Sequence, residues 1–296
     1  MANQDQKLEA KRLERVRKNP NGHWVGDGFP VRTLFAYSDG GQDLSPFLLL
    51  DFGGPREFAP TEKRLGVGPH PHRGFETVTV VYQGEVEHRD SAGGGGQIGP
   101  GDVQWMTAAR GLVHEEFHGR GFAARGGTFE MIQLWVNLPA ASKGVPPRYQ
   151  SLASQSIPTV ALPNDAGTGR IIAGEYADLR GPAETHSPML VLDMILNATK
   201  TVRLSLPEHW TTLLVVLSGQ AKTQSGEVIG AAEVGQFARS AKDLEFETTT
   251  ATRALLLCGQ PLAEPIAGSG PFVMNTEAEI RQAFADYRAG LLGSMD

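Results

Sequence analysis

The chain has 296 residues, of which 27 are Lys or Arg and 33 are Asp or Glu, for a formal net charge of −6. This mildly acidic balance argues against direct nucleic-acid binding, which needs clustered basic residues. The single cysteine, Cys258, excludes an internal disulfide and any cysteine-based zinc site. The longest apolar runs are too short to cross a bilayer, so no membrane association is expected.

The N-terminal segment, residues 1–23, is rich in both basic and acidic residues. It lacks the apolar stretch and the cleavage site of a signal peptide. We expect it to fray or to form a short surface helix. Together with the single cysteine, it predicts a protein of the reducing cytoplasm.

From Trp24 onward, short aliphatic or β-branched runs alternate with turns rich in Gly, Pro, Asn and Asp. Many short strands separated by such turns indicate a β-sandwich or a β-barrel. The expected strands include Thr77–Tyr82, Gln133–Asn137, Leu190–Leu196, Thr212–Leu217 and Ala254–Leu257. The fold class is therefore predicted to be all-β.

The β-rich region contains an internal repeat. Val80–Gly84 resembles Val215–Gly219 at an offset of 135, and Pro100–Gln104 resembles Val234–Ala238 at an offset of 134. Two similar barrels in one chain explain this repeat. The stretch 139–170 is rich in Pro and Gly, which fits a connection rather than a core element.

One helix is expected near the C-terminus. Thr276 and Glu279 have the spacing of a capping box, and Gly290 is a suitable stop. Apolar residues then recur at helical spacing and predict a packed face: Ile280, Ala283, Phe284 and Tyr287. The expected organisation is a charged segment (1–23), a first barrel (24–138), a connection (139–170) and a second barrel with the terminal helix (171–296).

The densest cluster of chemically active residues includes His70 and His72, which are separated by one residue. On an extended strand both side chains point to the same face, where two imidazoles can bind one metal ion. Glu76 has the same parity, so it is a candidate third ligand or a partner that orients a histidine.

A second cluster contains His114 and Glu116, again on one face of a strand, and His118 shares that parity if the strand continues. Two strands roughly 40 residues apart can face each other across a small barrel. That arrangement would bring together three imidazoles and one carboxylate. Such ligands, without thiolate, suit Fe, Mn, Ni, Cu, Co or Zn.

The second half of the repeat lacks these ligands. Applying the two offsets to the four candidate positions gives Ser205, Pro207, Thr248 and Thr250, none of which is a good ligand. One metal ion, in the first barrel, is therefore expected.

Several long motifs resemble the pirin family of bicupins. They are His70–Val78, Pro100–Ala108, Gly111–Glu116, Gln133–Pro139 and Gly270–Thr276. The resemblance spans about residues 20–290. It implies two tandem cupin (double-stranded β-helix, jelly-roll) barrels, with a divalent metal, iron(II) first among the candidates, in the N-terminal barrel and no metal in the C-terminal one.

The resemblance also implies the ligand set His70, His72, His114 and Glu116. In ordinary cupins the glutamate of the first motif is a ligand, which would be Glu76, but pirins use the glutamate two residues after the last histidine. Glu76 is thus a candidate outside the ligand set. Glu115 is an alternative to Glu116, although strand alternation turns Glu115 away.

Two functions follow from the resemblance. The first is a quercetin 2,3-dioxygenase-type reaction, in which a flavonol and O2 react at the metal, Glu116 or Glu76 accepts the flavonol hydroxyl proton, and carbon monoxide is released. Apolar walls are expected from residues near the ligands: Phe75, Trp105, Met106 and Phe117, although core packing is favoured for Trp105 and Met106. The alternative is a non-enzymatic, metal- and redox-sensing protein that modulates a transcription factor or a metabolic enzyme, with the N-terminal basic stretch as a candidate partner contact.

Overall fold

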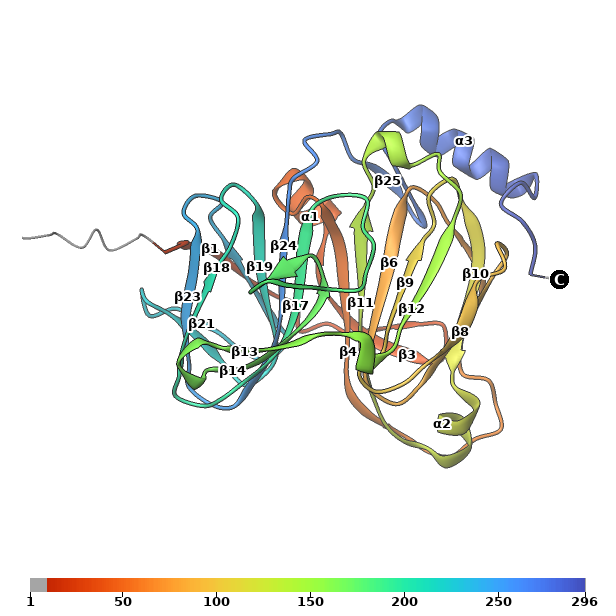
Figure 1. The fold of residues 1–296 in the computed structure, drawn as a ribbon. Coiled ribbons are helices and arrows are strands. Elements are labelled where there is room, and N and C mark those ends of the chain that lie inside the picture. Colours follow the sequence, from red (N-terminus) through yellow and green to blue (C-terminus); the bar gives the residue numbers. More distant parts are fainter. Residues whose placement is uncertain (1–9, 296) are drawn as a thin grey trace, which may run out of the picture. The chain divides into compact units, whose positions relative to one another are not determined.

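The computed structural model describes residues 10–295, and its regular structure is mainly β-strand (Figure 1). The chain divides into two compact units. The first unit comprises Asn19–Ile157, Pro182–Pro188 and Pro261–Asp296. The second unit comprises Met1–Lys18, Pro158–Gly181 and Met189–Gln260. Both units are discontinuous in the sequence.

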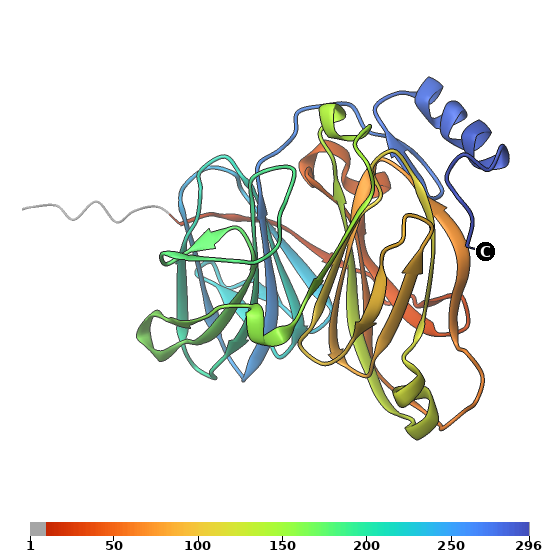
Figure 2. The same ribbon diagram turned by 45° about the vertical axis from the view of Figure 1, so that its right-hand side comes forward.

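The first unit contains a seven-stranded sheet of order β12-β9-β6-β11-β4-β3-β2 and a four-stranded sheet of order β5-β10-β7-β8, with antiparallel pairing throughout. Figure 2 gives a second view of these sheets. The strands are β2 (His23–Val25), β3 (Phe29–Ala36), β4 (Phe47–Phe58), β5 (Gly66–His72), β6 (Phe75–Gln83), β7 (Val86–Asp90), β8 (Gly95–Ile98), β9 (Val103–Thr107), β10 (Leu112–His118), β11 (Gly127–Asn137) and β12 (Arg148–Leu152).

The second unit has a seven-stranded sheet of order β1-β22-β19-β24-β17-β14-β13 and a four-stranded sheet of order β18-β23-β20-β21. The strands are β1 (Leu13–Lys18), β13 (Thr159–Leu162), β14 (Gly167–Ala173), β17 (Met189–Leu196), β18 (Thr201–Ser205), β19 (Thr211–Ser218), β20 (Ala221–Thr223), β21 (Val228–Ile229), β22 (Glu233–Phe237), β23 (Asp243–Thr248) and β24 (Thr252–Gly259). A separate hairpin joins β15 (Glu175–Tyr176) and β16 (Leu179–Arg180).

The two units repeat one topology. In each, a central strand (β6 or β19) pairs on one side with β9 or β22 and on the other with β11 or β24. Both central strands end at a glycine in the left-handed region, Gly84 (φ 87°) and Gly219 (φ 82°), as the repeated motif predicts. The all-β fold and the internal duplication are confirmed.

The remaining elements are short helices and one hairpin. The hairpin pairs β25 (Ala267–Ser269) with β26 (Phe272–Met274) in the first unit. The helices are α1 (Tyr37–Gly40), α2 (Arg120–Arg125) and α3 (Glu277–Arg288), and the 3-10 helices are η1 (Gly41–Asp43), η2 (Ala140–Ser142), η3 (Ser154–Ser156) and η4 (Pro163–Asp165). None of the helices that the structure describes has the length and hydropathy that a membrane crossing requires.

The C-terminal helix α3 forms as predicted. Thr276 accepts a hydrogen bond from the backbone of Glu279, whose carboxylate accepts one from the Thr276 backbone. Ile280 and Ala283 are buried, and the ring of Phe284 packs edge-on against Phe272 of β26 at 4.9 Å between centroids. The capping box is therefore confirmed, and so is the packed face except at Tyr287, which is exposed.

The N-terminal segment is not helical where it is described. Residues 13–18 form β1, which pairs with β22 at the edge of the second unit, so the expected surface helix is wrong there. Leu13 joins the apolar core of that unit, and Lys11 is buried with its ammonium near the carbonyl oxygens of Ala238 and Arg239. Residues 1–9 lie outside the described residues. The stretch 139–170 contains the edge strands β12 and β13.

Candidate metal centre

Two adjacent strands carry the first histidines. β5 and β10 pair antiparallel, with His70 opposite His114 and His72 opposite Leu112. His70 and His72 share one face of β5 because they are two residues apart. The register shifts between His114 and Glu116, which marks a local irregularity in β10 beside these residues.

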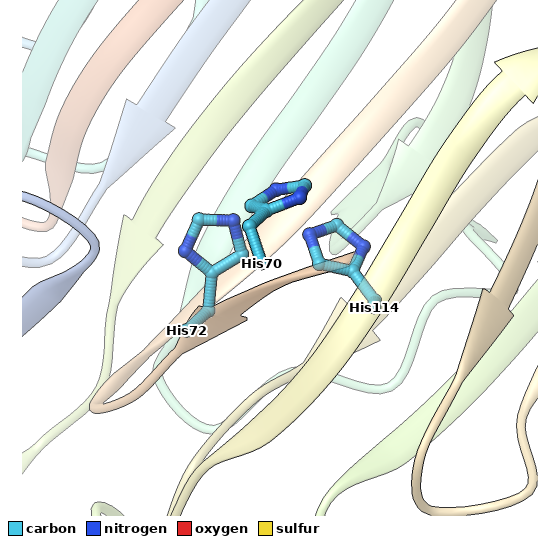
Figure 3. A group of neighbouring side chains, drawn as sticks. All are labelled: His70, His72 and His114. Atoms are coloured by element: carbon cyan, nitrogen blue, oxygen red, sulfur yellow. The ribbon is translucent and has the colours of Figure 1, made fainter. Parts of the chain in front are cut away.

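The imidazoles of His70, His72 and His114 point toward one another (Figure 3). The ring centroids lie 4.2 Å apart for His70 and His114, 4.8 Å for His72 and His114, and 4.9 Å for His70 and His72. One nitrogen from each ring lies within 4.8 Å of the others. Three nitrogen atoms this close can bind a single metal ion.

The hydrogen bonds of these rings show which nitrogen is free. The Nδ1 atoms of His70 and His72 lie 2.9 Å from the carbonyl oxygen of Gly68 and 3.3 Å from that of Pro271, so each carries a proton and donates. Each Nε2 then keeps its lone pair. The Nε2 of His114 is buried and has no hydrogen-bond partner.

Burial keeps two of these rings neutral. It lowers the pKa of His72 to about 3, with a further contribution from neighbouring His70. Burial and the neighbouring histidines also hold the pKa of His114 well below its usual value. Because a histidine must be neutral to bind a metal, these rings are prepared as ligands near pH 7.

Glu116 lies beside this cluster and is held by two amides. The side chains of Gln104 and Gln133 donate hydrogen bonds to its two carboxylate oxygens, Gln133 at 3.4 Å. Glu116 belongs to a second compact group of candidate ligand atoms with His88 and His114. Glu115, by contrast, points to the other face of β10, where Arg89 lies 3.2 Å away.

The structure does not bring Glu76 into either compact group. The turn at Arg73–Gly74 separates it from His72, so the parity of β5 does not extend to β6. On β6, Glu76 lies opposite Thr107, which donates a hydrogen bond to it at 2.7 Å. Burial raises the pKa of Glu76 to about 7, partly offset by this hydrogen bond. Thr79, which contacts Gln104 beside Glu116, points to the opposite face of β6.

His118 shares the parity of His114 but lies in an aromatic cluster. Its Nε2 lies 2.8 Å from the carbonyl oxygen of Gly28, and its ring packs against Phe58 and Phe129. Burial lowers its pKa.

One residue of the site, His88, is not among the candidates that the sequence analysis singled out. His88 is buried on β7, its Nδ1 lies 3.3 Å from Nδ1 of His114, and its Nε2 lies 3.2 Å from Asp90. His88 and Asp90 are two residues apart on a strand, the spacing that drew attention to the other pairs.

A cavity of about 330 Å³ adjoins the cluster. His70, His72 and Glu116 line it together with an apolar wall formed by Val25, Phe29, Val31, Val67, Met131 and Trp135. Phe117, a candidate wall residue, lies under the guanidinium of Arg64. Trp105 and Met106 are fully buried core residues, which was the favoured expectation for them. Phe75 contacts the rings of His72 and Trp135 without lining the cavity.

The donor set fits a divalent transition metal. Three closely spaced imidazoles and a nearby carboxylate match the preferences of such ions. A buried nitrogen without a hydrogen-bond partner, such as Nε2 of His114, is typical of a ligand atom. In the part of the chain that the structure describes, the second unit contributes no group of this kind, and its core is apolar.

Comparison with known proteins agrees with this organisation. A Pseudomonas aeruginosa protein named "Putative quercetin 2,3-dioxygenase" is 54% identical over 280 residues, which is 95% of this chain and 98% of that protein. Human pirin is 36% identical over 255 residues, covering 83% of this chain and 82% of the human protein.

A crystal structure of quercetin 2,3-dioxygenase from Acinetobacter baumannii matches with a TM-score of 0.95 and 50% identity, covering 97% of this chain and all of that one. The family model described as Pirin matches residues 28–136, and the model described as Pirin C-terminal cupin domain matches residues 191–293. The chain therefore belongs to the pirin family, with the expected two cupin barrels and a C-terminal helix.

Proposed function

We propose that the protein is a metal-dependent dioxygenase that opens the ring of a quercetin-type flavonol with O2. His70, His72, His114 and Glu116 would hold one divalent transition metal, for which iron(II) is the first choice. The observation that carries the proposal is the convergence of three imidazoles beside an apolar cavity, which two of them, His70 and His72, line. The names of the Pseudomonas and Acinetobacter relatives support it.

When bound, the metal would lower the pKa of a coordinated hydroxyl and promote reaction with O2. The chain's own residues provide position and a dry environment. A cavity of about 330 Å³ is at the small end of the range for ligand pockets. Its apolar walls, including Phe29 and Trp135, suit a flat aromatic molecule.

Glu116 is our proposed proton acceptor. Its carboxylate lines the cavity and is held in place by Gln104 and Gln133, so it would take the proton of the flavonol 3-hydroxyl. The overall reaction consumes one flavonol and one O2. It yields one phenolic carboxylic ester and one carbon monoxide, with the proton returned from Glu116 to the product.

The test is anaerobic loading with Fe(II), followed by quercetin and oxygen, with loss of flavonol absorbance and release of carbon monoxide as readouts. We expect turnover that depends on metal and that disappears in the His70→Ala/His114→Ala double variant. The matched control is His23→Gln, which changes an exposed histidine of β2.

Tight metal binding without turnover, under several metals, would refute the dioxygenase. It would then favour the alternative, a metal- and redox-sensing protein that acts through a protein partner. A cavity that admits a flavonol-sized ligand favours the enzyme, because a sensor needs no such space.

A further inference from the structure

Two buried side chains, Asp90 and His88, form a series of hydrogen bonds that connects a turn of the first unit to the candidate ligand His114. The backbone N–H groups of Ala92 and Gly94 donate to Oδ1 of Asp90 at 2.8 and 2.9 Å. The other oxygen, Oδ2, lies 3.2 Å from Nε2 of His88. The side chains of His88 and Asp90 are 0% and 1% exposed, so no water competes for these contacts.

Each contact in this series determines which nitrogen of the next ring carries a proton. A carboxylate only accepts hydrogen bonds, so Nε2 of His88 must carry a proton. A neutral His88 ring then has its lone pair on Nδ1, which lies 3.3 Å from Nδ1 of His114. The proton between these two nitrogens therefore belongs to His114, and Nε2 of His114 is left with a lone pair.

Tyr149 holds the ring of His88 in place. Its ring stacks on His88 with centroids 4.9 Å apart and planes inclined by 14°. The same tyrosine donates a hydrogen bond to Oε1 of Gln104 at 3.3 Å. This directs the NH2 group of Gln104 toward Glu116.

We infer that Asp90 and His88 are positioning residues that fix His114 in the tautomer whose Nε2 faces His70 and His72. Partners of this kind orient metal-binding histidines in other proteins, and losing one typically weakens metal affinity by about 10–100-fold. The inference rests on the metal-binding part of the proposed function and is independent of the dioxygenase reaction.

Asp90→Asn is a specific test because the backbone N–H groups at this position fix the orientation of the new side-chain amide. Its oxygen would keep the hydrogen bonds from Ala92 and Gly94, which places the NH2 group toward His88. His88 would then accept at Nε2 and donate from Nδ1. His114 would have to accept at Nδ1, so its proton would move to Nε2.

The first readout is the tautomer of His114 in the metal-free protein, by NMR with ¹⁵N-labelled histidine, assigned through loss of the resonance in His114→Gln. The second is the affinity for Co(II), by calorimetry. We expect Nδ1–H in the wild type, Nε2–H in Asp90→Asn, and a fall in Co(II) affinity of about 10–100-fold. The matched control is Asp102→Asn, another turn aspartate that accepts two backbone N–H groups, from Gly99 and Ser154; it should leave both readouts unchanged.

An unchanged His114 tautomer in Asp90→Asn would overturn the inference, as would a reversed tautomer with unchanged Co(II) affinity. If Asp90→Asn does not fold, His88→Phe is the second test, because it keeps an aromatic ring against Tyr149 and removes the nitrogen that accepts from His114. A single Nδ1–H tautomer of His114 in His88→Phe would also overturn the inference. A wild-type protein with the expected tautomer but no Co(II) affinity would refute the proposed metal site and leave the tautomer assignment standing.

Discussion

Buried histidines make the stability of the metal-free protein depend on pH. The pKa of His72 falls from 6.5 to about 3 because the ring is buried. Between these values the unfolded chain takes up a proton at His72 that the folded chain does not. The free energy of unfolding must therefore decrease as the pH falls from 6.5 toward 3, by up to about 1.4 kcal/mol per pH unit for each such histidine.

We predict that His72→Gln flattens this pH dependence. The measurement is the urea midpoint of the metal-free protein between pH 7 and pH 4, followed by tryptophan fluorescence. Trp24, Trp105 and Trp135 all belong to the first unit, so the signal reports mainly on that unit. His23→Gln serves as the control and should keep the wild-type slope. Equal slopes in His72→Gln and the wild type would contradict the prediction.

Glu76 shows the opposite linkage. Its pKa is raised to about 7 by burial, so the folded chain retains a proton that the unfolded chain has lost above pH 4.5. Stability therefore falls as the pH rises through this window. At pH 8 the buried carboxylate is ionised at a cost of about 1–3 kcal/mol.

We predict that Glu76→Gln stabilises the protein at pH 8 by an amount of about 1–3 kcal/mol and has little effect at pH 4. Because Glu76 lies on the face of β6 away from Gln104, metal affinity and turnover should stay within about twofold of the wild type. Glu116→Gln, the matched change at a proposed ligand, should lose both. Loss of turnover in Glu76→Gln at full metal occupancy would restore Glu76 as a catalytic candidate.

At the scale of elements, a buried lysine stabilises the turn between β5 and β6 by hydrogen bonds. Lys143 is 4% exposed, and its ammonium donates to the carbonyl oxygens of Gly74 and Val273 at 2.6 and 2.9 Å and to Oδ1 of Asn137 at 2.7 Å. Burial lowers its pKa to about 8, so it remains mainly protonated at pH 7. It thus ties the turn that follows His72 to β26 and to the end of β11.

We predict that Lys143→Met lowers the free energy of unfolding by about 3 kcal/mol, because buried carbonyl groups lose their donor at about 1–3 kcal/mol each. Urea titration at pH 7 measures this change. Lys200→Met removes a lysine paired with Asp165 on the surface of the second unit and should change stability by less than about 1 kcal/mol. A similarly small effect of Lys143→Met would show that water satisfies these carbonyls.

At the scale of the whole molecule, the two units share one strand order but have different interiors. The first unit contains the histidine cluster and the cavity, whereas the second unit is filled by residues such as Leu192, Leu214 and Phe246. We predict one metal ion per chain, measured by elemental analysis after loading and removal of excess metal. The His70→Ala/His114→Ala variant should contain none. Two ions per wild-type chain would contradict the assignment of a single site.

Local patterns in the sequence were sufficient where the structure depends on neighbours along the chain. The i and i+2 spacing of His70 and His72 placed both on one face of β5 because alternation holds within a continuous strand. The capping box at Thr276 and Glu279 predicted α3 because its hydrogen bonds span only three residues. The duplication was visible because each half repeats the same strand and glycine turn.

Other features depend on pairing between distant segments and were decided only by the tertiary structure. Residues 13–18 of the N-terminal segment form strand β1 because they pair with the edge of β22, which lies more than 200 residues later in the sequence. His88 joined the site because β7 pairs with β10, which brings it to His114. Glu76 lies away from the histidines because the turn at Gly74, with φ at 91°, begins a new strand. Residue types and spacing thus determined which chemistry the chain carries, and strand pairing decided which of its residues meet.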